Sequence, residues 1–130
     1  MNSHARGAFD VRTIPQPADE EGVAIGRLLL DKQFHGDLEA TSKGQMLAVR
    51  TGVANSAGYV AMEQVTGTLL GRTGSFALQH SGTMNRGEQE LLITVVPDSG
   101  TGELAGLMGT MMIIIEGGKH SYDFEYSIDD

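Results

Sequence analysis

The stretch ANSAGYVAMEQVTGTLLGRTGSFALQHSG, residues 54–82, decides the fold of this chain. It contains two runs in which side-chain character alternates residue by residue, and a glycine-rich turn, 70–74, separates them. Alternation with a period of two on both sides of a turn is typical of an antiparallel β-hairpin with one buried face. The rows that we expect to face the interior are Tyr59, Ala61, Glu63 and Val65 on the first strand and Phe76, Leu78 and His80 on the second.

Working outward from this hairpin, similar apolar and alternating runs recur between polar or glycine-containing turns. They predict eight strands, over residues 5–13, 23–34, 37–50, 58–69, 74–83, 88–96, 105–116 and 119–128. No stretch shows a helical period with caps. Eight strands joined by short turns favour an up-and-down meander, which removes its exposed edges by closing. The sequence therefore predicts an all-β, closed eight-stranded antiparallel meander barrel that forms a single domain over residues 1–130.

Three local features add detail to this prediction. Gly117 and Gly118 are the tightest turn signal in the chain, since glycine takes positive φ angles without strain. Gly44, inside the third strand, suggests a β-bulge. The seventh strand is almost continuously apolar over 108–115, which suggests that both of its faces are buried. One face would line the interior, and a neighbouring subunit or the N-terminal arm would cover the other, so we expect a homo-oligomer.

Composition excludes several classes of protein. The net charge of −8 disfavours binding to nucleic acid, whose phosphates are also negative. There is no cysteine, hence no disulfide and no thiol chemistry. The longest apolar run, 111–115, is far too short for a membrane span, and the first residues lack the hydrophobic core of a signal peptide. A soluble, cytoplasmic protein without a membrane or nucleic-acid partner is the expectation.

Glu63 and His80 are the first candidates for chemistry, because ionisable groups on an apolar face need partners. If paired, the carboxylate would orient the imidazole for acid–base work. The alternative is a satisfied polar pair with no catalytic role. Tyrosines on inward rows either donate to a ligand or pack as aromatic core. We therefore predict a small polar spot within an apolar cavity, and its candidate lining residues are Tyr59, Glu63, Phe76, Leu78, His80, Tyr122 and Tyr126.

Metal and phosphate sites are not expected. The four histidines, at positions 4, 35, 80 and 120, form no local pair of the kind that metal-binding barrels use. The segment SGTGE, residues 99–103, is not followed by the lysine and hydroxyl residue of a phosphate-binding loop. We predict no metal and no cofactor.

Several motifs together resemble a family of small bacterial proteins of unknown function. They are Gly36-Asp37-Leu38, YVAME at 59–63, Gly67-Thr68-Leu69 with Gly71-Arg72, Gly74-Ser75-Phe76 with Gln79-His80, VPDSGTGEL at 96–104, and His120-x-Tyr122-x-x-x-Tyr126. The resemblance covers nearly the whole chain, in order and with matching spacing. It implies a barrel similar to that of allene oxide cyclases, which bind an apolar epoxide inside the barrel and isomerise it. It transfers no catalytic residue to this chain.

Three functions remain open at this point. The first is the binding of a small, largely apolar ligand inside the barrel. The second is an isomerase or cyclase acting on such a ligand, and whether the protein is an enzyme is not decided. The third is a filled barrel that acts through assembly. A fold by itself does not choose among them.

Overall fold

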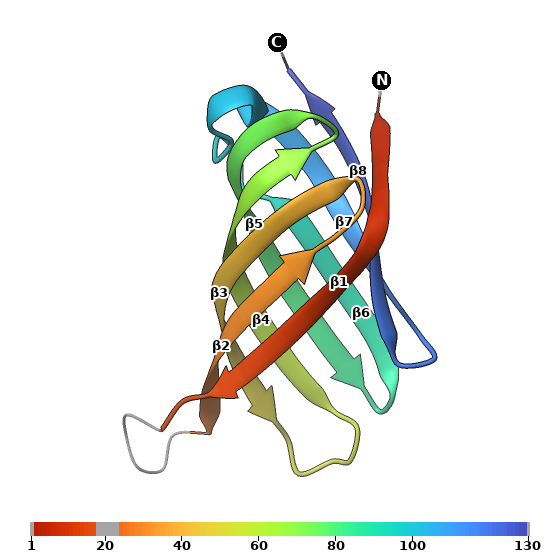
Figure 1. Ribbon diagram of the computed structural model, residues 1–130. Coiled ribbons are helices and arrows are strands. Elements are labelled where there is room, and N and C mark those ends of the chain that lie inside the picture. The colour runs from red at the N-terminus through yellow and green to blue at the C-terminus, as the bar shows by residue number, and fades with distance from the viewer. Residues whose placement is uncertain (1, 18–23, 130) are drawn as a thin grey trace.

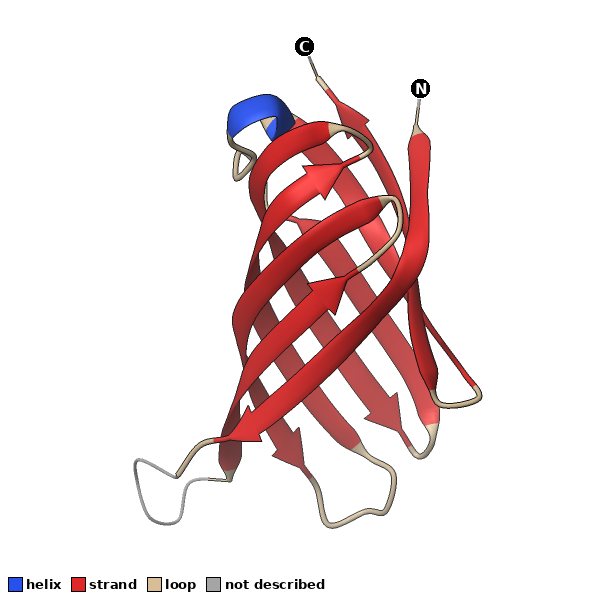
Figure 2. Ribbon diagram, viewed as in Figure 1, coloured by secondary structure: helices blue, strands red, loops and turns tan. Residues whose placement is uncertain are grey.

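The fold is described by a computed structural model over residues 2–17 and 24–129. Residue 23, where we expected the second strand to begin, lies outside these ranges. The strands are β1 (Ser3–Pro15), β2 (Ile25–Phe34), β3 (Leu38–Arg50), β4 (Ala57–Leu69), β5 (Arg72–Asn85), β6 (Glu88–Val95), β7 (Leu107–Glu116) and β8 (Lys119–Ile128). One short 3₁₀ helix, η1 (Gly102–Leu104), precedes β7. In the described residues it is the only helix, in line with the all-β prediction (Figure 2).

The strands form a closed antiparallel barrel in which each strand pairs with its neighbours in sequence. β1 closes the ring: its first half pairs with β8, and its second half pairs with β2 (Figure 1). The predicted closed eight-stranded meander is therefore confirmed. The tightest predicted turn is confirmed as well, because Glu116 pairs with Lys119 and the two glycines between them have φ angles of 57° and 78°.

Gly44 does not form the predicted bulge, since the pairing of β3 with β4 runs without interruption from Leu38 to Arg50. The glycine is required for a different reason. It lies opposite Glu63, and a Cβ atom at Gly44 would be 2.7 Å from the Cβ of Glu63 and would overlap the carbonyl oxygen of Met62. Any side chain here would push β4 away and displace the Glu63 carboxylate.

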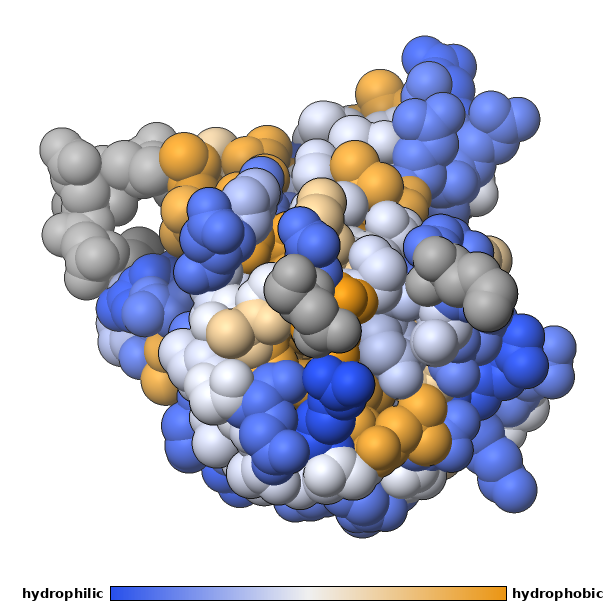
Figure 3. All heavy atoms as spheres, turned by 90° about the horizontal axis from the view of Figure 1, so that it is seen from above, coloured by the Kyte–Doolittle hydropathy of each residue, from blue (hydrophilic) through white to orange (hydrophobic). Residues whose placement is uncertain are grey.

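The half of the barrel near the termini is packed with side chains. Its core includes Phe34, Leu38, Leu69, Phe76, Leu78, Leu107, Tyr122 and Phe124, each at most 1% exposed. Leu104 of η1 is fully buried and belongs to this core, so the segment between β6 and β7 helps to close this end. Seen from this end, polar side chains surround much of the surface and apolar ones show between them (Figure 3). No described helix is long and apolar enough to span a membrane.

Within the single chain β7 is buried on one face only, and the expected cover of its other face by a neighbouring subunit stays a prediction. Its inward row includes Leu107 and Met111, whereas the outward side chains of Met108 and Met112 are 61% and 64% exposed. The N-terminal arm does not cover them, because it forms β1 and lies between β2 and β8. The outward face of β7 is therefore an exposed apolar surface of the single chain.

Candidate functional site

Four consecutive strands bring a cluster of polar side chains into the barrel interior. Lys32 from β2, Ser42 from β3, Glu63 from β4 and His80 from β5 are all less than 9% exposed. The Glu63 Oε1 atom lies 3.0 Å from the Lys32 Nζ and 2.5 Å from the His80 Nε2. The Ser42 hydroxyl donates to the Glu63 Oε2 at 2.5 Å. Both oxygens of a deeply buried carboxylate are thus satisfied, and Glu63 and His80 form a hydrogen-bonded pair.

These contacts determine the charge state of Glu63. Burial alone would raise the pKa of its carboxyl group, because it disfavours the charged form. The hydrogen bond from His80, the charge of Lys32 and the hydrogen bond from Ser42 outweigh burial and lower the pKa to about 2. Glu63 is therefore an anion at neutral pH. As an acceptor it requires the proton of the His80 imidazole on Nε2.

A cavity of about 430 Å³ occupies the half of the barrel away from the termini. This volume is within the range of about 300–1,000 Å³ that is typical of small-molecule sites. Its wall is mostly apolar and includes Phe9, Leu30, Met46, Ile93, Ile113 and Ile115. Its inner end carries the buried Lys32 and His80, and exposed residues at strand ends, among them Arg50 and Glu90, surround its mouth.

The seven candidate residues all lie on inward rows, but only two of them line the cavity. Tyr59 and His80 line it. Burial and the nearby charge of Glu63 raise the pKa of the Tyr59 hydroxyl, which is therefore neutral at pH 7. Phe76 and Leu78 belong to the packed half of the interior. Tyr126 stacks on Phe124 at 5.4 Å between ring centroids and belongs to the same core.

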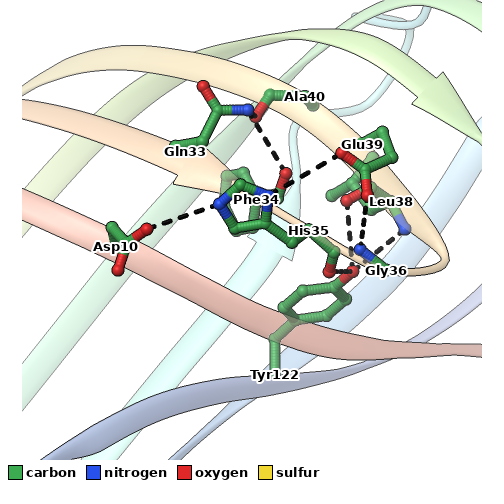
Figure 4. Close-up of polar contacts among 9 residues, drawn as sticks. All are labelled: Asp10, Gln33, Phe34, His35, Gly36, Leu38, Glu39, Ala40 and Tyr122. Atoms are coloured by element: carbon green, nitrogen blue, oxygen red, sulfur yellow. Dashed lines mark hydrogen bonds and ion pairs between the residues drawn. The ribbon is translucent and has the colours of Figure 1, made fainter.

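Tyr122 serves the fold instead of the cavity. Its hydroxyl accepts the backbone N–H of Leu38 at 2.9 Å and donates to the carbonyl oxygen of His35 at 2.7 Å (Figure 4). Burial raises the pKa of this phenol. The ring packs edge-on against Phe34. Tyr122 thereby joins the last strand to the turn between β2 and β3, and its hydroxyl is committed to the backbone.

Lys32 and Ser42 are site residues that sequence reasoning missed. Lys32 carried a signal: it lies in the row Leu28, Leu30, Lys32 and Phe34, where a charge interrupts an otherwise apolar face. That is the same signal that drew attention to Glu63. Ser42 carried none, because a serine is common on either face of a strand. Within residues 2–17 and 24–129, no group of three or more acidic, histidine or cysteine side chains is arranged to hold a metal ion.

The fold and the site define a small β-barrel protein that is packed at one end and holds a cavity with a charged inner end in the other half. The chain belongs to the family described as "Protein of unknown function (DUF3224)", which matches residues 5–126. It is similar to a DUF3224 protein of unknown function from Shewanella oneidensis MR-1, whose crystal structure is known. The two chains are 50% identical, with a TM-score of 0.95 over 100% of this chain and 99% of that one.

The expected membership of a family of unknown function is confirmed by these matches. No curated protein matches the chain. The further likeness to allene oxide cyclases stays a prediction.

Proposed function

We propose that this protein binds a small, largely apolar ligand inside the barrel. The observation that carries the proposal is the cavity of about 430 Å³, whose wall is apolar and whose inner end is polar. Apolar wall area favours a hydrophobic ligand through removal of water. A few polar groups at one end orient such a ligand, as in most small-molecule sites. The filled-barrel alternative is disfavoured, because side chains pack tightly in only one half of the interior.

Native mass spectrometry of the protein purified from its own host tests this proposal directly. We expect the native protein to have a mass above that of the chain. The excess mass belongs to a bound small molecule, which denaturation should release. Ala48→Trp fills the cavity, because Ala48 lines it. Leu47→Trp is the matched control, since the adjacent side chain lies on the outer surface and is 45% exposed. If the Leu47→Trp protein retains the ligand and the Ala48→Trp protein loses it, the proposal is supported. If both variants retain the ligand equally, the proposal is refuted.

An isomerase is the second candidate, and the contact between Glu63 and His80 favours it. A carboxylate that holds an imidazole in one tautomer leaves Nδ1 able to accept a proton, which is the arrangement of a general base. The ligands extracted from the wild-type and His80→Asn proteins would separate the two functions. A binding protein returns the same compound from both. An isomerase returns the product from the wild type and the unconverted isomer from the variant, which chromatography distinguishes.

A homo-oligomer in the cytoplasm, without nucleic-acid or membrane partners, remains part of this proposal. Its support is the exposed apolar face of β7 and the net charge of −8.

A further inference from the structure

The buried cluster presents its nitrogen-bearing side chains, and not its carboxylate, to the cavity. Lys32 and His80 line the cavity wall, whereas Glu63 and Ser42 do not. Both carboxylate oxygens of Glu63 are already occupied by the three donors around it. A ligand that reaches the inner end of the cavity therefore meets an ammonium and an imidazole.

Lys32 keeps donor capacity for a ligand. An ammonium has three N–H donors, and within the described residues the Lys32 Nζ makes one hydrogen bond, to Glu63. It also lies 5.4 Å from the ring centroid of Phe9 and 5.9 Å from that of Phe34. Aromatic faces at these distances attract a cation. The site thus stabilises the positive charge of Lys32 at the inner end of an apolar cavity. Two N–H donors of this ammonium remain unused.

We propose that the ligand is an amphipathic anion, a medium-chain carboxylate, whose head binds Lys32 and His80 while its apolar tail lies along Leu30, Ile93 and Ile113 toward the mouth. This inference rests on the proposed binding function. A carboxylate matches the unused donors of Lys32, and charge-assisted hydrogen bonds are the stronger ones. The net charge of −8 would repel an anion at long range, so the local donors must supply the selectivity.

Isothermal titration of the ligand-free full chain with octanoate, 1-octanol and octylammonium tests the inference, because the three probes share one tail and differ in the head. We expect octanoate to bind at least tenfold more tightly than either of the others.

Two variants locate the head of the ligand. Lys32→Met leaves Glu63 with one cation fewer and risks unfolding, so Lys32→Met/Glu63→Gln, which removes both charges together, is the main variant. It should lose the preference for octanoate over 1-octanol. Lys43→Met is the matched control, because Lys43 on the outer surface is 84% exposed, and it should keep the preference.

The outcomes are distinguishable. If 1-octanol binds as tightly as octanoate, the inference is overturned while the binding function stands. If Arg50→Gln removes the preference and the Lys32→Met/Glu63→Gln variant keeps it, the carboxylate lies at the mouth and the inference is wrong. If none of the three probes binds to ligand-free protein, both the inference and the proposed function are overturned.

Discussion

The imidazole of His80 and the carboxylate of Glu63 meet inside the barrel although they are not opposite each other in the sheet. Their Nε2 and Oε1 atoms lie 2.5 Å apart, while the strand register pairs His80 with Ala61 and Glu63 with Leu78. They are diagonal neighbours on one face of an antiparallel pair, a separation that long side chains can bridge. Lys32 reaches the same oxygen from β2, so donors from both sides converge on a single acceptor.

The buried cluster should make stability depend on pH in the acid range. The pKa of Glu63 is about 2 in the folded protein, against a usual 4.5. Ionisation of Glu63 therefore stabilises the fold above pH 4.5, and this contribution is lost as the pH falls toward 2, on the order of 3 kcal/mol in total. The comparison is with Lys32→Met/Glu63→Leu/His80→Leu, which removes the ionisable groups of the cluster together.

Urea unfolding of both proteins at several values between pH 2 and 5 measures this effect. The wild type should lose more of its free energy of unfolding across that window than the triple variant does. Parallel curves for the two proteins would mean that Glu63 does not titrate in this way.

Tyr122→Phe should lower the free energy of unfolding by about 1–3 kcal/mol, because it leaves the N–H of Leu38 and the carbonyl of His35 without their partner. Urea denaturation measures the change. Tyr59→Phe is the control: in the described part of the chain the Tyr59 hydroxyl makes no hydrogen bond, so its removal should cost much less. An equal loss in both variants would contradict the role assigned to the Tyr122 hydroxyl.

Replacement of Gly117 and Gly118 by valine should destabilise the protein by more than about 1 kcal/mol, since both residues have positive φ and a β-branched side chain is strained there. Thermal melting measures the loss. Gly52→Val is a suitable comparison, because the space around Gly52 is open and its φ lies outside the left-handed range. Unchanged melting of the Gly117 and Gly118 double variant would show that the turn tolerates side chains.

Leu70→Asn should raise stability by about 0.5–1 kcal/mol. Leu70 is the first residue of the two-residue turn Leu70-Gly71 and has a φ of 45°. Its side chain is 53% exposed, so it gains little from packing. Asparagine tolerates this conformation better and is preferred before glycine in such turns. Chemical denaturation checks the change. Leu70→Ala keeps the backbone strain and should show no gain, so a gain of the same size in both variants would exclude relief of strain as the cause.

The outward face of β7 should hold two copies of the chain together. Met108, Met112 and Leu92 of neighbouring β6 are each more than half exposed. The two strands are joined by a single bridge, between Thr94 and Thr110. Sedimentation at micromolar concentration should show an oligomer, and Met112→Lys should dissociate it. Met62→Lys, on the outer face of β4, is the control that should not. A wild-type monomer would contradict the expectation.

The sequence by itself determined the strands, their order and the direction of the central rows. Period-two alternation is a local property, and the glycine-rich turn at 70–74 sets the register of the hairpin on either side of it. Residues such as Phe76 and His80 could therefore be placed inward. The inward position of Glu63 followed from the same alternation. These conclusions needed only the geometry of a strand and of a turn.

Only the tertiary structure decided which inward residues share a space. The pairing of β2 with β3, and of β3 with β4, brings Lys32 and Ser42 to Glu63 from parts of the chain 31 and 21 residues away. Closure of the barrel packs Tyr122 and Tyr126 into the core, while Tyr59 lines the cavity. Alternation shows which face a side chain takes, but its height along the barrel depends on the tilt and offset of all eight strands together.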